Sequence, residues 1–468
     1  MKIKKLVFAL YFGNRGFFPE SLLHSAREEL KVVVEKAGHD TLMMPEGATR
    51  FGAVETTDEG LKYAEFLDAN RGKYDGVILC LPNFGDETGA IAALRDCGVP
   101  ILIQAYPDEL SKMGVKSRRD AFCGKLSVMD VFRQYALPFT NFEPHTVHPK
   151  SREFARQLVD FAGVCRVVNS LKRMTVGAIG ARTTAFKTVR FDELTLQRYG
   201  ITTETLDLSE LISRVRKLGT SGEAFRAKAH TLKNYTNWKG VPAEAFQTLA
   251  KLGVVLDEVI GEYSMDAVAL RCWIELEKEL HVSPCVLLSE LNDRGIPAAC
   301  ELDVGNAIPM FALSLASGQA ATCLDWNNNY GKDPDKCILF HCGPVPQSLM
   351  TAKGQVIDHP MFAKALGGGC GYGCNVGRIA AAPMTFSSSK TENGKLMFYL
   401  GEGEFTRDKI PADFFGCAGV AKIQGLQKKL RGIGAEGYRH HVAVTTGHVE
   451  VPVHEAFRNY LKYDLVDL

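Results

Sequence analysis

Two acidic residues in the last third of the chain are placed where they could bind a divalent cation. Glu301 follows the apolar run IPAAC, Asp325 follows the apolar run AATCL, and a helix-like stretch lies between them. The pattern predicts a β-α-β unit with a carboxylate at the end of each strand. Because consecutive strands usually pair, at a spacing of about 4.8 Å, we expect both carboxylates to reach one cation. The structural alternative is that Glu301 caps the following helix and Asp325 orders the asparagine-rich turn.

Histidines near two later strand ends could complete the ligand set. His440 and His441 open the run HHVAVTT. Because alternate residues of a strand point to opposite faces, only one of them can face the cation, and the pattern does not say which. His341, in LFHCGP, is a second candidate ligand and could equally be a buried histidine of the core. Two carboxylates and an imidazole suit Mn²⁺ or Mg²⁺ better than a structural zinc ion, which prefers cysteine and histidine.

A divalent site of this kind suits proton transfer between neighbouring carbons of an open-chain sugar. A cation can hold both oxygens of an enediolate, and carboxylates beside it can move the proton, an effect worth roughly 10²–10⁴ in rate. Glu301 and Asp325 are therefore the predicted proton-transfer pair. The pattern leaves open which of them takes the C2 proton.

Other polar residues at strand ends or in loops could contact a substrate. Lys187 and Arg190, in ARTTAFKTVRFDE, could bind an anionic group or form a solvated helix face. Trp326 could provide a flat wall for a sugar ring. The glycine- and cysteine-rich loop at 365–377 is read as a flexible loop, because no second Cys or His pair lies at zinc-finger spacing. The candidate substrate-binding residues are Arg15, Lys187, Arg190, Trp326, Asn327 and His440.

The elements that must position these residues fall into three parts. Residues 1–172 alternate short apolar strands with helical patterns, which predicts a doubly wound parallel sheet, without a G-x-G-x-x-G after the first strand. Residues 173–329 repeat the α/β pattern and carry the two carboxylates. Residues 330–468 are strand-rich and carry the histidines, which predicts an antiparallel β domain. The fold class is α/β: two doubly wound, Rossmann-like domains followed by an antiparallel β domain.

Length and composition narrow the class of protein. The chain has 468 residues, 46% hydrophobic and 23% charged, with a formal net charge of +1. Neither nucleic acid nor an anionic membrane is expected as the main partner, because both attract basic proteins. No apolar stretch approaches the roughly 18–20 residues that span a bilayer. The N-terminal run is predicted to be a strand rather than a signal peptide, and the cysteines show no disulfide framework, so we expect a cytoplasmic protein.

The motifs ACELDVGN, CLDWNN, LFHCGP and the late HHVAVTTG together resemble the L-fucose isomerase/L-arabinose isomerase superfamily, in its shorter fucose isomerase-like branch. The resemblance implies that Glu301, Asp325 and His441 bind a catalytic Mn²⁺, with Mg²⁺ or Co²⁺ as alternatives. It also implies that His341 stands where the arabinose branch has a further metal-site histidine. An aldose–ketose isomerase is expected, assembled as a homotrimer or homohexamer in which a neighbour's N-terminal domain contributes to each active site.

The resemblance leaves the sugar open, because the chain is shorter than well-studied members and differs in the loops at 182–193 and 365–377. Fucose-like deoxy sugars, pentoses and an anionic sugar such as sulfoquinovose, held by Lys187 and Arg190, are the alternatives. Two other functions also stay open. One is a cytosolic sugar-binding or sensing protein, and the other is a sugar epimerase that uses the same metal site.

Overall fold

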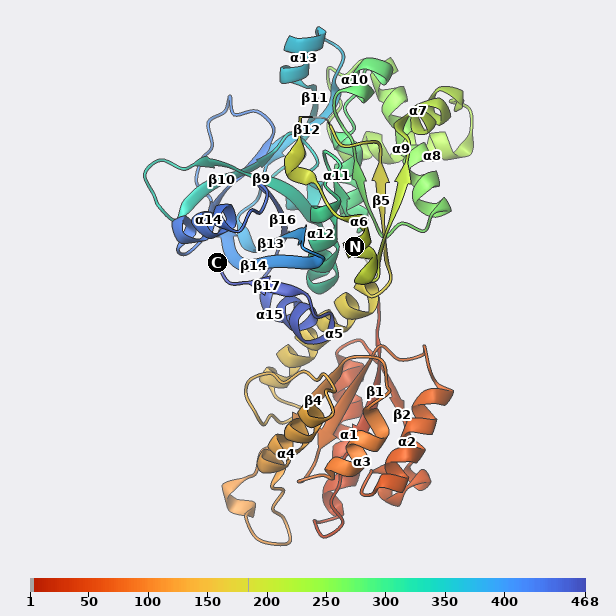
Figure 1. Ribbon diagram of the computed structural model, residues 1–468, viewed down its shortest axis with the longest axis vertical. Coiled ribbons are helices and arrows are strands. Elements are labelled where there is room, and N and C mark those ends of the chain that lie inside the picture. The colour runs from red at the N-terminus through yellow and green to blue at the C-terminus, as the bar shows by residue number, and fades with distance from the viewer. Residues whose placement is uncertain (1–3, 184) are drawn as a thin grey trace. The chain divides into compact units, whose positions relative to one another are not determined.

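The computed structural model describes residues 4–183 and 185–468 of the chain, which form two compact units. The N-terminal unit comprises residues 4–170 and 451–462, and the larger unit comprises residues 171–450 and 463–468. Figure 1 labels most of the helices and many of the strands of each. Within the described residues, no helix is both long and apolar enough to cross a membrane.

Four parallel strands form the sheet of the N-terminal unit, in the order β2-β1-β3-β4. The strands are β1 (Val7–Phe12), β2 (Asp40–Met43), β3 (Gly76–Leu81) and β4 (Ile101–Ala105). The helices are α1 (Ser21–Lys36), α2 (Thr57–Ala69), α3 (Glu87–Leu94), α4 (Ala121–Gln134), α5 (Arg152–Leu171), and, late in the chain, α15 (Glu450–Glu455) with a π-helical turn (Ala456–Tyr460). β3 is buried along its whole length, as expected of a parallel strand with both faces covered.

A second parallel sheet opens the larger unit, in the order β6-β5-β7-β8. Its strands are β5 (Met174–Ile179), β6 (Ile201–Leu206), β7 (Ala267–Leu270) and β8 (Ala298–Ala299). Its helices are α6 (Glu193–Arg198), α7 (Leu208–Lys217), α8 (Glu223–Tyr235), α9 (Ala243–Glu262), α10 (Glu275–Leu280), α11 (Cys285–Arg294) and α12 (Val304–Ser317). Leucine, valine and isoleucine side chains from these helices and strands form the core of this part.

Nine strands form the remaining sheet of the larger unit, in the order β11-β12-β15-β10-β9-β16-β13-β14-β17. They are β9 (Ala321–Asn329), β10 (Lys336–His341), β11 (Gln355–Asp358), β12 (Tyr372–Arg378), β13 (Ala382–Glu392), β14 (Lys395–Phe405), β15 (Cys417–Lys422), β16 (His441–Thr446) and β17 (Asp464–Val466), with helices α13 (Pro360–Leu366) and α14 (Leu426–Ala435). Most pairs are antiparallel, but β12–β15 and β14–β17 are parallel, so the sheet is mixed. The predicted fold class, two doubly wound α/β parts followed by an antiparallel β part, is confirmed, with the difference that two strand pairs of the last sheet are parallel.

The predicted pairing of the two strands that flank α12 is wrong. β8 pairs with β7, whereas β9 pairs with β10 and β16 in the nine-stranded sheet. The physical reason is α12 itself, which is buried all round from Val304 to Ser314 and contacts strands of both sheets. A helix that is apolar on every side needs cover on every side, so the chain changes sheets across it. The domain boundaries at 172 and 329 stay a prediction.

Candidate metal centre

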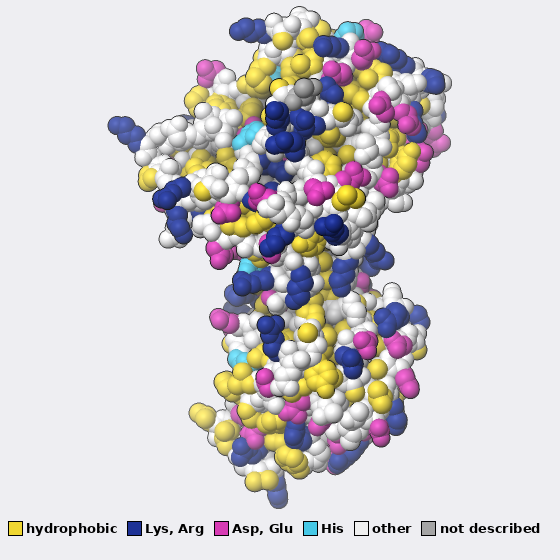
Figure 2. All heavy atoms as spheres, in the orientation of Figure 1, with side chains coloured by type: hydrophobic (Ala, Val, Ile, Leu, Met, Phe, Trp, Pro, Cys, Tyr) yellow, Lys and Arg dark blue, Asp and Glu magenta, His cyan; other side chains and the backbone are white. Residues whose placement is uncertain are grey.

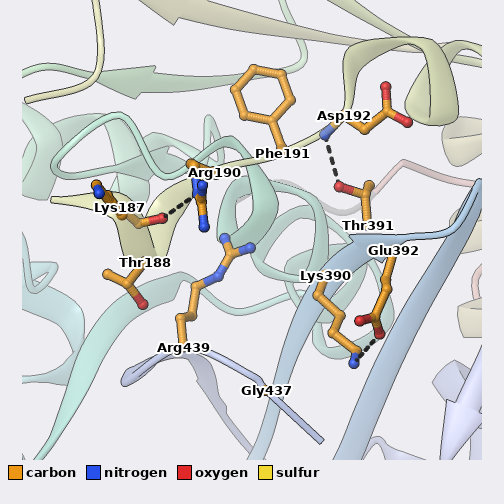
Figure 3. A pocket seen from close by; sticks show the side chains of 10 residues that line it. All are labelled: Lys187, Thr188, Arg190, Phe191, Asp192, Lys390, Thr391, Glu392, Gly437 and Arg439. Atoms are coloured by element: carbon orange, nitrogen blue, oxygen red, sulfur yellow. Dashed lines mark hydrogen bonds and ion pairs between the residues drawn. The ribbon is translucent and has the colours of Figure 1, made fainter. Parts of the chain in front are cut away.

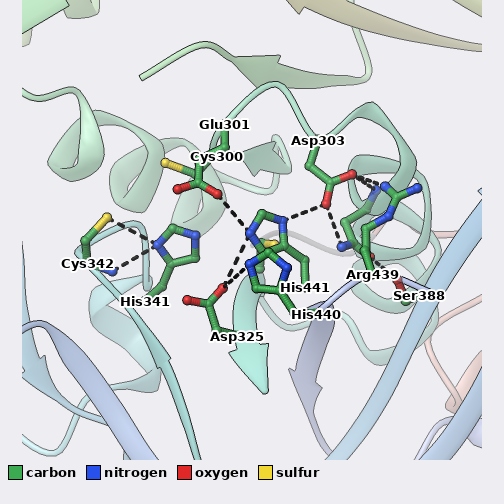
Figure 4. A network of polar contacts seen from close by, with 12 residues as sticks. Cys300, Glu301, Asp303, Asp325, His341, Cys342, Ser388, Arg439, His440 and His441 are labelled. Carbon is green, nitrogen blue, oxygen red and sulfur yellow. Dashed lines mark hydrogen bonds and ion pairs between the residues drawn. The ribbon is translucent and has the colours of Figure 1, made fainter. Parts of the chain in front are cut away.

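The strand register of the nine-stranded sheet brings the predicted metal ligands together. Antiparallel pairing of β9 with β16 sets Asp325 opposite His441. On its other side β9 pairs with β10, whose last residue is His341. Glu301 arrives from the short turn between β8 and α12. Figure 4 shows these four side chains converging on one another.

The distances within this group suit ligands of a single cation. His441 Nε2 lies 2.9 Å from Glu301 Oε2 and 3.4 Å from Asp325 Oδ1. One side-chain atom each of Glu301, His341 and His441 lies within 4.8 Å of the others, and the same holds for Asp325, His440 and His441. A donor set of carboxylate oxygens and imidazole nitrogen fits Mn²⁺ or Mg²⁺.

Unmet hydrogen-bonding capacity also points to a bound cation. Asp325 Oδ1 is buried and has no hydrogen-bond partner in the described part of the chain, and the buried His441 Nε2 faces the carboxylates of Glu301 and Asp325. Leaving a polar atom buried without a partner costs about 1–3 kcal/mol. A positive ion between these groups would give the unpaired Asp325 oxygen a partner.

Asp303 holds His441 in the form that a metal ligand requires. His441 Nδ1 donates to Asp303 Oδ2 at 2.8 Å, so Nε2 is the nitrogen that faces the carboxylates and that would bind a cation. Asp303 also pairs with the buried Arg439 and accepts from the backbone N–H of Asn306. Burial alone would raise the pKa of Asp303, but Arg439 and His441 outweigh it and lower that pKa to about 2. Asp303 rather than Glu301 is thus the N-cap of α12.

The hydrogen bond of His341 favours the opposite tautomer. Its Nδ1 accepts the backbone N–H of Cys342 at 2.9 Å, so the neutral ring carries its proton on Nε2. That nitrogen therefore faces the group as a hydrogen-bond donor, whereas a metal ligand would need its lone pair. The role of His341 as a further metal ligand stays a prediction.

The two carboxylates occupy different electrostatic environments. Burial opposes ionisation of Glu301, but the hydrogen bond and charge of His441 outweigh burial and lower the pKa of this carboxyl. Burial raises the pKa of Asp325, although His341 and His441 partly offset the rise. Trp273 Nε1 donates to Glu301 Oε1 at 3.0 Å and so orients the carboxylate from the far side.

The backbone at Glu301 is strained. Glu301 and Leu302 both have φ of +61°, in the left-handed region that non-glycine residues avoid. Such a conformation costs about 1–3 kcal/mol at each residue and persists only where surrounding contacts impose it. Here the contacts of Glu301 with His441 and Trp273, and the helix cap formed by Asp303, impose this conformation.

Of the predicted substrate residues in the larger unit, some lie near the candidate metal centre and others point away from it. His440 lies beside the group, with Nε2 3.9 Å from Asp325 Oδ1. Lys187 and Arg190 follow Phe186, whose ring packs against both His440 and His441. Trp326 points away, because it lies on the opposite face of β9 from Asp325 and its Nε1 donates to Tyr399.

The remaining two predicted residues lie in other parts of the described chain. Asn327 is exposed on β9, beyond Asp325. Arg15 belongs to the N-terminal unit, where its guanidinium pairs with Glu87. The substrate roles of both stay predictions.

Several site residues were missed by sequence reasoning. Asp303 carried a readable signal, an acidic residue just before a long apolar helix, and Arg439 directly precedes the two histidines. Trp273 and His359 carried none, because they come from elements that only the fold brings near. Both line a cavity of about 390 Å³ beside the group, together with Cys272, Ile274, Ser283, Cys285, Glu301, Asp325, Phe340, His341, Cys342, Met361, Phe362 and Ala365.

Known proteins match both ends of the chain. Residues 9–172 match the family model of the fucose/sulfoquinovose isomerase N-terminal domain, and residues 339–468 match that of the L-fucose isomerase C-terminal domain. A sulfoquinovose isomerase of Priestia aryabhattai is 25% identical over 289 residues, 61% of this chain and 63% of that protein. A sulfoquinovose isomerase of Alkalicoccus urumqiensis is 22% identical over 389 residues, 82% of this chain and 84% of that protein.

The match to the Priestia protein thus spans less than two thirds of that relative's length. The two family models nevertheless match in the order in which a fucose isomerase carries them, and the predicted ligand motifs lie between and within the matched parts. The chain belongs to the fucose isomerase-like family.

Proposed function

We propose that the protein is a metal-dependent aldose–ketose isomerase that acts on an open-chain sugar through a cis-enediol or enediolate. The observation that carries the proposal is the convergence of Glu301, Asp325 and His441, with a buried oxygen of Asp325 that lacks a hydrogen-bond partner among the described residues. Family membership supports the same chemistry, since the relatives are named sulfoquinovose isomerases.

Glu301, Asp325 and His441 would hold the cation, Mn²⁺ or alternatively Mg²⁺ or Co²⁺. When bound, the cation polarises the sugar oxygens as a Lewis acid and templates the substrate. Asp303 keeps the His441 tautomer, and Trp273 keeps the Glu301 carboxylate in place. The carboxylates of Glu301 and Asp325 carry the proton between C2 and C1.

His341 has a separate part in the proposal. Its Nε2 proton points into the group without a partner in the described structure, so it can donate to an oxygen of the sugar as negative charge develops there. The rest of the 390 Å³ cavity would hold the open chain of the sugar.

A basic pocket supports an anionic sugar as substrate. It has a volume of about 420 Å³ and includes the cations Lys187, Arg190, Lys390 and Arg439, against Asp192 and Glu392 (Figure 3). Figure 2 shows basic side chains gathered on this face of the larger unit.

Two of the four cations in this pocket form ion pairs with acidic residues of the protein. Lys390 pairs with Glu392, and Arg439 pairs with Asp303. Lys187 and Arg190 are exposed and make no ion pair with the described residues, so they stay available for a sulfonate or similar group.

The test is proton NMR in D₂O of the Mn²⁺-loaded protein with sulfoquinovose and a panel of neutral aldoses. Loss of the C2 proton signal with a ketose appearing supports the isomerase, whereas a second aldose without ketose would identify an epimerase. Bound sugar with no exchange would identify a binding protein. Lys187→Ala is expected to raise KM for the sulfonated sugar about tenfold and to leave a neutral aldose unaffected.

Assembly as a homotrimer or homohexamer in the cytoplasm belongs to the same proposal. The N-terminal unit exposes large apolar side chains, among them Leu110 at 95%, Val115 at 84% and Phe17 at 79%. Exposed apolar side chains that form a contiguous patch are typical of surfaces that bind another chain. Light scattering after size-exclusion chromatography measures the assembly, and a fully active monomer would contradict this part.

A further inference from the structure

A cluster of cysteine side chains lies directly behind the candidate metal centre. The sulfur atoms of Cys285, Cys300 and Cys342 all lie within 4.8 Å of one another. Cys285 Sγ and Cys342 Sγ are 3.6 Å apart, and Cys272 Sγ lies 3.0 Å from Cys300 Sγ. These sulfur atoms are contributed by segments that are far apart in the sequence, so only the fold assembles the cluster.

The spacing of the three sulfurs suits a thiophilic cation. Zinc–sulfur bonds of about 2.3 Å in a tetrahedron place neighbouring sulfurs about 3.8 Å apart. The 3.6 Å separation of Cys285 and Cys342 is close to that edge, and a small inward movement of Cys300 would complete a triangle. Three thiolates select soft or borderline cations such as Zn²⁺ and Cd²⁺ over Mg²⁺ or Mn²⁺.

A buried carboxyl beside the cluster is a second, independent observation. Glu277 is 0% exposed, and the Ser283 side chain supplies a hydrogen bond to its carboxyl group. The charge of Cys342 also acts on this carboxyl, and Ser283 Oγ lies 3.5 Å from Cys285 Sγ. Burying an acid is costly, and a cation among the adjacent sulfurs would stabilise it.

The cluster also has a path to solvent. Cys272, Cys285 and Cys342 line the 390 Å³ cavity, so a cation can reach the sulfurs through the space that the candidate centre uses. Cys300 directly precedes Glu301 in the chain, and Cys342 directly follows His341. A cation held by these sulfurs would therefore also restrain two residues of the candidate centre.

We propose that Cys285, Cys300 and Cys342 form a second cation site, specific for a thiophilic ion of the Zn²⁺ and Cd²⁺ class. Binding replaces the thiol protons, which leave to solvent, and forms cation–sulfur bonds without any change of oxidation state. The site is distinct from the oxygen-rich group of Glu301, Asp325 and His441, and it does not depend on the reaction proposed above.

The test is titration of the whole, phosphine-reduced protein with Cd²⁺, followed by the ultraviolet charge-transfer absorption of cadmium–thiolate bonds. We expect the absorption to saturate at about one Cd²⁺ per chain. The double variant Cys285→Ser/Cys300→Ser should lose at least about nine-tenths of it. Cys123→Ser and Cys337→Ser are matched controls, one exposed and one buried, and both should retain it.

Two outcomes would overturn the proposal: no thiolate absorption in the reduced protein, or absorption that survives in the double variant. If that variant fails to fold, cadmium-113 NMR of the unaltered protein decides, since sulfur ligands shift the signal far from the range of oxygen and nitrogen ligands. Glu301→Gln should keep the cadmium–thiolate absorption. Loss of isomerase activity alone therefore does not count against the thiol site.

Discussion

The N-terminal unit and the candidate metal centre both gather polar side chains near strand ends, but they differ in whether those side chains bind one another. After β1 and β3, Asn83 donates to Asn14, Asn14 donates to Glu55, and Arg15 pairs with Glu87. At the centre, Asp325 Oδ1 has no such partner in the described residues, and His441 Nε2 faces the carboxylates of Glu301 and Asp325. The carboxyl ends of parallel strands are common ligand sites, yet only polar groups left unpaired by the protein are free to bind a cation.

Glu301→Gln tests the metal-centre side of this comparison and carries the largest expected effect. An amide keeps the shape but removes the charge that binds the cation and the base that moves the proton. We expect turnover to fall by at least about 10³-fold and Mn²⁺ affinity to fall with it, while the fold is retained. Electron paramagnetic resonance measures the bound Mn²⁺. Glu55→Gln, in the self-paired cluster, is the control and should keep full Mn²⁺ affinity.

Asp303→Asn tests whether the centre depends on the carboxylate behind His441. Arg439 would be left buried without its ionic partner, so we expect the free energy of unfolding to fall by about 3–5 kcal/mol. Loss of the His441 tautomer should lower Mn²⁺ affinity about 10–100-fold. Denaturant unfolding and Mn²⁺ titration measure the two effects. Asp207→Asn removes only the charge of an exposed N-cap of α7 and should cost about 1 kcal/mol or less without changing Mn²⁺ affinity; equal effects in both variants would contradict the assignment.

Lys125 sharpens the comparison, because its charged amino group lies in the N-terminal unit with a neutral carbonyl, rather than a carboxylate, as its partner. It is 1% exposed and donates only to the carbonyl of His145 in the contacts described, and burial lowers its pKa from 10.5 to about 8. The unfolded chain therefore binds more protons between those values, so the free energy of unfolding should rise with pH across that window, by about 3 kcal/mol at most. Lys125→Met should remove this rise, as measured by urea unfolding at several pH values. A slope that persists in the variant would show that another group causes it.

Asn83→Ala tests the self-paired cluster and carries the smallest expected effect. It leaves the Oδ1 of Asn14 and the backbone N–H of Gly85 without their partner, at a cost of about 1–3 kcal/mol in unfolding free energy. Mn²⁺ affinity should be unchanged, since the cluster binds itself rather than a cation. Asn234→Ala, at an exposed position on α8, should change stability by no more than about 0.5 kcal/mol. A drop in Mn²⁺ affinity in Asn83→Ala would break the comparison.

Sequence reasoning predicted the fold class and gathered Glu301, Asp325 and a histidine as one group, because acidic and imidazole side chains beside apolar runs are visible in the letters. It placed β8 and β9 in one sheet, because it assumed that neighbouring strands pair. The residues that hold the group in shape were less accessible. Trp273 and His359 reach it from distant elements, and no local sequence pattern indicates such contacts.

What the sequence by itself determined was the kind of chemistry: oxygen and imidazole ligands, apolar strands to carry them, and a basic stretch at Lys187 and Arg190. What only the tertiary structure decided was which atoms remain unpaired. Asp303 takes one nitrogen of His441, and the backbone of Cys342 takes one of His341, so two histidines alike in the sequence face the centre with opposite hydrogen-bonding character. The physical reason is that side-chain type depends on one residue, whereas a tautomer or an unmet hydrogen bond depends on every neighbour that folding brings near.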